Sequence, residues 1–154
     1  MCRRPFTWCK PMKITSTGLH FAILHHTGYG EPHYDLMFEV GPRHPLLTFR
    51  SAVWPIDRRV QLVRLGEHRR DYLSYEGPVS GDRGEVRKIA GGTFDLAGDG
   101  QNILLTYTAG TPQEPLVITD TAEAIPYTMF RLMSAKKEVP ETSRHSPAPR
   151  EGGS

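Results

Sequence analysis

The chain has 154 residues, with 19 lysine and arginine residues against 17 aspartate and glutamate residues. This length suits one compact domain with short tails and excludes two full domains. The nearly balanced charge gives no overall attraction for nucleic acid, so an anionic partner would have to be recognised by a local group of residues.

The first segment, residues 1–17, mixes Pro, Arg, Cys and Lys without periodicity, and we expect it to be a flexible arm. Both cysteines, Cys2 and Cys9, lie in it, which indicates free thiols in a reducing compartment rather than a disulfide scaffold. No apolar run is long enough to span a membrane, and the N-terminal residues lack the apolar core of a signal peptide. We therefore predict a cytoplasmic protein without a membrane partner.

Residues 18–133 contain short apolar or alternating runs separated by many of the 15 Gly and 13 Pro residues. No window keeps an apolar stripe at helical spacing for three turns. The pattern predicts a mainly β domain, either a small antiparallel β-barrel or a sandwich, with short helical turns such as His68 to Ser74. The runs are LHFAIL, HYDLMFEV, PLLTFR, RVQLVRL, GEVRKI, GTFDLA, QNILLTY, PLVITD and YTMFRLM.

A tail at 134–154 follows this domain. It has one Val and no Leu, Ile or aromatic residue. Such a segment cannot bury enough apolar surface to offset the entropy of ordering, so it is predicted to be disordered.

The sharpest group of chemically useful residues is HHTGYGEPHYD, which begins at His25. In a strand that starts at His33, the side chains of His33 and Asp35 share one face, while the intervening residues are apolar and face the core. The preceding run would pair with this strand and bring His26 or His25 alongside. Two imidazoles and a carboxylate suit a catalytic divalent metal such as Mn²⁺ or Zn²⁺. The alternative interpretation is a polar strand face in contact with solvent.

A second group lies in EHRRDYLSYEG, where His68 and Tyr72 are four residues apart and would share a face of one helical turn. Histidine can protonate a leaving oxygen, and tyrosine can donate a hydrogen bond to a phosphate oxygen. Nearby arginines could bind phosphate through two hydrogen bonds, and basic residues outnumber acidic ones between Arg50 and Lys88. The alternative interpretation is a solvated charged surface.

The next stretch, GPVSGDRGEVRKIAGGTF, is rich in Gly beside Arg and Lys. It could cradle a phosphate, but two hairpin turns, SGDRG and AGG, are the preferred interpretation. The stretch matches neither a P-loop nor a dinucleotide-binding fingerprint.

Together, HYDLMFE, the strand LLTFR and EHRRDYLSYEGPVSGDRGEVRKIAGGTF resemble the 3′-phosphoesterase domain of bacterial DNA ligase D. They are more similar still to the free-standing members of this DNA polymerase/ligase N-terminal domain family. The resemblance covers about Phe21 to Phe94, with weaker support to Leu132. It implies a β-barrel with a basic groove that trims 3′ ends with Mn²⁺, removing a terminal ribonucleoside and then the 3′-phosphate.

The resemblance also implies roles for individual residues and partners. It predicts a Mn²⁺-dependent 3′-phosphoesterase that heals DNA or RNA ends in repair, a monomer that could act with separate ligase or polymerase proteins. The implied metal ligands are His26, His33 and Asp35, the catalytic residues are His68, Tyr72 and Arg64, and the substrate-binding residues are Arg50 and Arg70.

The sequence departs from the family pattern at three places. The lysine expected after the third strand has no counterpart. The link Thr27–Pro32 is one residue longer and contains no arginine, so His25 could replace His26 as a ligand. Gly66 stands where the family has an acidic residue. These departures favour an alternative function, a non-catalytic module that binds nucleic-acid ends. A third candidate is a hydrolase of a small phosphoester.

Overall fold

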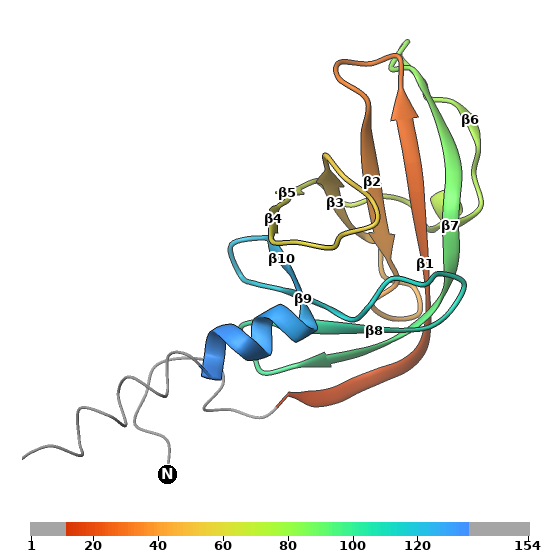
Figure 1. Cartoon of the computed structure of the whole chain (residues 1–154). Helices are drawn as coiled ribbons and strands as arrows, with labels where there is room; N and C mark the ends of the chain where they lie inside the picture. The colour runs from red at the N-terminus through yellow and green to blue at the C-terminus, as the bar shows by residue number, and fades with distance from the viewer. Residues whose placement is uncertain (1–11, 136–154) are drawn as a thin grey trace, which may run out of the picture.

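The structure, a computed structural model, describes residues 12–135 of the chain. Its strands form one ten-stranded sheet in which every pairing is antiparallel. The sheet curls into a nearly closed barrel, and a helix follows the last strand (Figure 1). The predicted mainly β fold, a small antiparallel β-barrel with short helical turns, is confirmed.

The strands are joined by short connections at the Gly- and Pro-containing segments that separate the apolar runs. The 3-10 turn η2 is the helical turn expected after His68. In chain order the elements are β1 (Lys13–Thr27), β2 (His33–Phe38), β3 (Leu47–Ser51), β4 (Val60–Gln61), β5 (Val63–Arg64), η2 (Arg70–Leu73), β6 (Gly77–Pro78), β7 (Glu85–Gly98), β8 (Ile103–Ala109), β9 (Leu116–Ile118), β10 (Glu123–Pro126) and the helix 127–135.

The barrel closes at a single buried residue. The strand order is β4-β10-β9-β8-β7-β1-β2-β3-β5, with β6 paired to β7, so the sheet starts at β4 and ends at β5. Only Leu62 separates these two strands along the chain. Its N–H donates to the carbonyl of Ala122 at 2.9 Å, and the N–H of Leu65 donates to the carbonyl of Thr48 at 3.0 Å. The chain thus bridges both edges, which leaves little open strand edge.

Strands β1 and β2 bury side chains on both of their faces. Phe21, Leu36 and Phe38 belong to the main core inside the barrel, as the alternation in HYDLMFEV predicted. Leu24 and Met37 point the other way and belong to a second apolar cluster. The segment containing η2 and β6 covers this outer face, with Tyr72, Leu73, Tyr75 and Val79 packed against it. The predicted His and Asp face is therefore covered rather than open.

The ends of the domain differ from the prediction. Strand β1 begins at Lys13, so the predicted N-terminal arm was wrong for residues 13–17, which pair with β7. The run YTMFRLM is helical rather than a strand. The last bond of the β9–β10 pair runs from the N–H of Tyr127 to the carbonyl of Pro115 at 2.8 Å, and the Met, Leu and Arg residues that follow favour a helix. The two cysteines and tail residues 136–154 lie outside the described residues, while 134 and 135 are helical.

The predicted AGG turn was also wrong, because GEVRKI and GTFDLA form one continuous strand, β7. These glycines serve a close approach between strands. A Cβ added to Gly92 would lie 2.0 Å from the carbonyl oxygen of Ala109, so only glycine fits there. Within residues 12–135, none of the helical segments has the length and apolar character needed to cross a membrane.

Candidate functional site

The β1–β2 hairpin brings three potential metal ligands together. His26 lies opposite His33 in the ladder, and Leu24 lies opposite Asp35, so the three polar side chains share the outer face. One ligand atom from each of them lies within 4.8 Å of the others. The exposed fractions are 8% for His26 and 5% for both His33 and Asp35, so the group is buried.

His25 lies on the opposite face of β1. It pairs with Tyr34, and the two rings stack with centroids 4.9 Å apart. The geometry therefore selects His26 rather than His25 as the histidine that joins His33 and Asp35.

Backbone carbonyl groups fix the tautomers of both histidines. Nε2 of His26 lies 2.6 Å from the carbonyl oxygen of Arg83, and Nδ1 of His33 lies 2.9 Å from that of Glu31. A carbonyl oxygen can only accept, so each of these nitrogens carries a hydrogen. In the neutral rings, the other nitrogens, Nδ1 of His26 and Nε2 of His33, then carry lone pairs.

Both lone-pair nitrogens face the carboxylate of Asp35. Nδ1 of His26 is 3.2 Å from Oδ2, and Nε2 of His33 is 3.4 Å from Oδ1. Nε2 of His33 and Oδ1 of Asp35 are buried and have no hydrogen-bond partner among the described residues. Acceptors that face one another in a buried place are costly unless a cation lies between them.

Two imidazoles and a carboxylate form a donor set for a divalent metal with open coordination positions. The carbonyl groups of Arg83 and Glu31 act as the outer partners that metal-binding histidines usually have. The group His26, His33 and Asp35 could therefore hold a metal ion.

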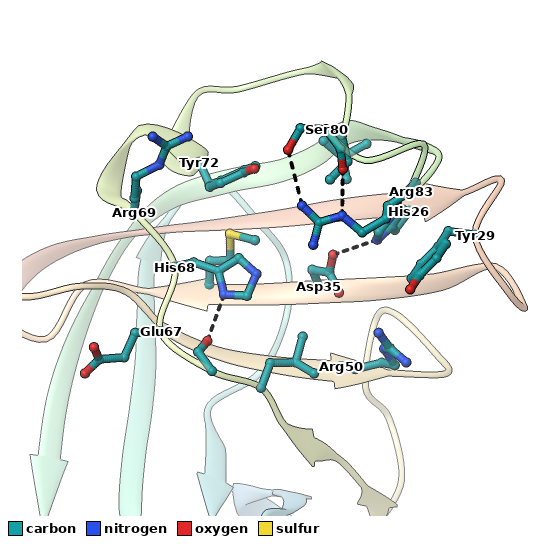
Figure 2. A pocket seen from close by; sticks show the side chains of 15 residues that line it. His26, Tyr29, Asp35, Arg50, Glu67, His68, Arg69, Tyr72, Ser80 and Arg83 are labelled. Atoms are coloured by element: carbon teal, nitrogen blue, oxygen red, sulfur yellow. Dashed lines mark hydrogen bonds and ion pairs between the residues drawn. The ribbon is translucent and has the colours of Figure 1, made fainter.

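A pocket of about 490 Å³ opens beside this group (Figure 2). It lies between the outer face of β1–β3 and the segment from Leu65 to Arg83. Three arginines and two acidic residues line it, so its charge favours an anion. His33 is not among the residues at its surface. The lining residues are His26, Tyr29, Asp35, Met37, Arg50, Leu65, Gly66, Glu67, His68, Arg69, Tyr72, Val79, Ser80, Arg83 and Val86.

The predicted pair His68 and Tyr72 lies in this pocket. The backbone of His68 pairs with Leu46, and η2 then places Tyr72 with its ring edge-on to the imidazole at 5.7 Å. Nδ1 of His68 donates to the carbonyl of Gly66 at 2.8 Å. Figure 2 shows the ring directed into the pocket, so Nε2 is the atom available to a bound ligand.

Two of the predicted site arginines, Arg50 and Arg64, lie on opposite faces of the sheet. Arg50 is opposite Asp35 in the ladder and lines the pocket, and its buried Nε has no partner among the described residues. Arg64 pairs with Phe49, which is the neighbour of Arg50 in β3. Successive residues of a strand point to opposite faces, so Arg64 belongs to the other face. It lies over the Phe49 ring at 5.8 Å and lines a different pocket. The structure therefore does not bring Arg64 into the site.

Arg70 has a structural role instead of the predicted substrate contact. Its guanidinium donates to the carbonyl of Gly41 at 3.0 Å and pairs with the carboxylate of Glu39, and it does not line the pocket. Burial tends to raise the pKa of Glu39, but hydrogen bonds from the N–H and ring of His20 and from Arg70 lower it overall. This ion pair ties η2 to the end of β2.

The sequence interpretation missed two further pocket residues. Tyr29 lies in the β1–β2 turn. The planes of its ring and the His26 ring differ by 19°, and the ring centroids are 6.2 Å apart. Arg83 lies in the SGDRG turn, whose predicted hairpin is confirmed by the pairing of β6 with β7. Its Nε donates to the carbonyl of Ser80 at 2.6 Å, and its Nη2 donates to Oγ of Ser80 at 3.3 Å. An aromatic residue flanked by two glycines was the available signal for Tyr29.

Neither a scan against protein-family models nor a search of curated proteins finds a match to this chain. The relation to the phosphoesterase domain of DNA ligase D therefore stays a prediction that depends on the sequence resemblance.

Proposed function

We propose that the protein is a metal-dependent phosphoesterase that acts on the 3′ ends of DNA or RNA, with Mn²⁺ as its metal. One observation carries the proposal: two fixed imidazole lone pairs and a buried carboxylate converge at the wall of a pocket lined by arginines. The resemblance to the phosphoesterase domain supports Mn²⁺ as the metal and a 3′ end of DNA or RNA as the substrate.

In this proposal His26, His33 and Asp35 hold the metal. When bound, the metal would neutralise phosphate charge and lower the pKa of a coordinated water. The guanidinium of Arg50 and the hydroxyl of Tyr72 would donate to the non-bridging phosphate oxygens.

Hydrolysis of a 3′-phosphate forms a bond between the water oxygen and phosphorus and breaks the bond between phosphorus and the 3′ oxygen. The leaving oxygen takes up a proton to become the 3′ hydroxyl. Nδ1–H of His68 is already donated to the carbonyl of Gly66, so the imidazolium form of the ring would supply that proton from Nε2. Nε2 would take a proton back from the attacking water, whose other hydrogen stays on the released phosphate.

The test is incubation of the full chain with an end-labelled oligonucleotide that carries a 3′-phosphate or a single 3′-ribonucleotide. We expect dephosphorylation or shortening with Mn²⁺ and none with EDTA. His26→Ala and His68→Ala should abolish the reaction. His25→Ala is the matched control, because this neighbouring histidine points to the opposite face and should leave the rate unchanged.

The other candidate functions give different results in the same experiment. A non-catalytic end-binding module would bind the oligonucleotide with an affinity that falls with salt, and would release no product with any divalent metal. A hydrolase of small phosphoesters would turn over a short phosphomonoester as fast as the oligonucleotide. Equal loss of activity in His25→Ala and His26→Ala would contradict the assigned metal group.

A further inference from the structure

Tyr29 is a large aromatic residue that the fold leaves uncovered. Its exposed fraction is 49%, yet it lines the same pocket as Asp35 and His68. Gly28 and Gly30 on either side have φ values of 82° and 72°, a conformation that glycine adopts without strain, so they set the path of the turn. The tyrosine side chain is thus presented by a defined turn without being needed in either apolar cluster.

Arg83 contributes to the site in two ways. Its carbonyl oxygen accepts the hydrogen of Nε2 of His26, which orients that ring. Its side chain is held by Ser80 through Nε and Nη2, and Figure 2 shows the guanidinium extending over the pocket toward Asp35. A guanidinium has five N–H donors, so donors remain for an anion after these two bonds. The same residue can therefore orient a metal ligand and contact a phosphate.

We infer that Tyr29 and Arg83 form a subsite for one unpaired nucleotide, with the base stacked on Tyr29 and the phosphate between Arg83 and the metal group. The inference rests on the proposed function, which places a phosphate at the group His26, His33 and Asp35. Stacking on an aromatic ring accepts every base, because each base has a π-face. Arg83 supplies the charge-assisted hydrogen bonds that a phosphate oxygen favours.

The substrate class follows from the size and position of this subsite. A pocket of about 490 Å³ has the size of a small-ligand site. A base inside it cannot stay stacked and paired in a duplex, and the unstacking penalty is least for a base that is already unpaired. The preferred substrate is therefore a single-stranded or frayed 3′ end, and a fully paired end is bound more weakly.

Binding without turnover tests this inference directly. The full chain carrying His68→Ala, the background for every variant below, is titrated in Mn²⁺ with fluorescent single-stranded oligonucleotides that carry a 3′-phosphate on either an ordinary or an abasic terminal nucleotide. Tyr29→Ala should weaken binding of the ordinary end about 5- to 150-fold, the range expected for one base stacked on an aromatic ring. Binding of the abasic end should stay unchanged, and Tyr29→Phe should restore the affinity of the background protein because it keeps the ring.

Arg83→Gln should weaken binding of both oligonucleotides, because it removes the phosphate contact but keeps the carbonyl that orients His26. Arg87→Gln is the control for loss of one charge. Arg87 is exposed on β7 and pairs with His25, two positions that both lie on the face away from the pocket, so its effect should be much smaller.

Equal losses for ordinary and abasic ends in Tyr29→Ala would overturn the inference. So would a His68→Ala protein that binds a fully paired 3′ end as tightly as a frayed one. These results are distinct from failure of the proposed function: base-dependent binding without Mn²⁺-dependent product from the wild type would reject the enzyme and keep the subsite. Mn²⁺-dependent product with unaltered binding in Tyr29→Ala would reject the subsite alone.

Discussion

Replacing Asp35 by asparagine should have opposite effects on stability with and without a divalent metal. In the metal-free protein the carboxylate lies at hydrogen-bond distance from Nδ1 of His26, 3.2 Å, and 3.4 Å from Nε2 of His33, where Oδ1 of Asp35 and Nε2 both lack a hydrogen-bond partner among the described residues. Asparagine has nearly the same shape, carries no charge and can donate a hydrogen bond to one of these nitrogens. Relief of the buried, unsatisfied acceptors should make Asp35→Asn more stable than the wild type in EDTA by about 1–3 kcal/mol.

A bound metal should reverse this order. A metal at 100 times its Kd stabilises the folded wild type by about 2.7 kcal/mol. For a domain of this size, each kcal/mol corresponds to roughly 3–5 °C in Tm, so the wild-type Tm should rise by about 10 °C. Asp35→Asn lacks the only anionic member of the donor set and should show little of this rise.

The assay is thermal unfolding of the full chain at pH 8, in EDTA and then across a titration with Mn²⁺. Asp57→Asn is the control, because Asp57 is exposed and its one ion pair within residues 12–135 is a surface contact with its neighbour Arg58. An Asp35→Asn protein that is less stable than the wild type in EDTA would refute the claim that the unpaired acceptors on Asp35 and His33 destabilise the metal-free protein. A wild-type Tm that no divalent metal raises would refute the metal site.

Three further outcomes are expected. Glu39→Gln should lower the free energy of unfolding at pH 7 by about 1–3 kcal/mol in chemical denaturation. Because the pKa of Glu39 is lowered in the fold, the lost contribution is present above the ordinary carboxyl pKa and disappears as pH falls through the folded value. The two denaturation profiles should therefore converge in acid, and a constant difference would contradict the shift. Arg50→Gln should reduce turnover about 100-fold, whereas Arg64→Gln should leave it unchanged; equal losses would contradict the assigned faces. Gly92→Ala should lower Tm far more than Gly98→Ala, since an added Cβ lies 2.0 Å from backbone at Gly92 and no closer than 3.5 Å at Gly98; similar Tm values would show that the strands can separate.

Local periodicity was enough to predict that His33 and Asp35 share a face with one histidine of the preceding strand. The alternation in HYDLMFEV places His33 and Asp35 on one face, and a hairpin brings the preceding strand alongside. The choice between His25 and His26 required the actual register, because one residue of shift exchanges the two faces. The spacing of His68 and Tyr72 likewise predicted a shared helical turn, and the structure has one there.

The missed features depend on contacts between segments that are distant in the sequence. The family resemblance implied a catalytic role for Arg64, but the pairing of β5 with β3 places it over Phe49. Arg83 was predicted only to lie in a turn, because the neighbouring sequence does not show that the carbonyl of this turn contacts His26. Gly92 was interpreted as a turn residue. Glycine is required there because the backbone of Ala109 in the neighbouring strand leaves no space for a Cβ, and a sequence pattern does not show this contact.

The closure of the barrel at Leu62 has a kinetic consequence. The bonds on either side of it join residues that are far apart along the chain, so this seam has to form after both β3 and β10 are in place. Transient opening of the seam would then expose the amides of Leu62 and Leu65 to hydrogen exchange while β1, β2 and β7 stay paired. His68 is held by its own backbone pairing with Leu46, so the pocket can stay assembled while the seam opens.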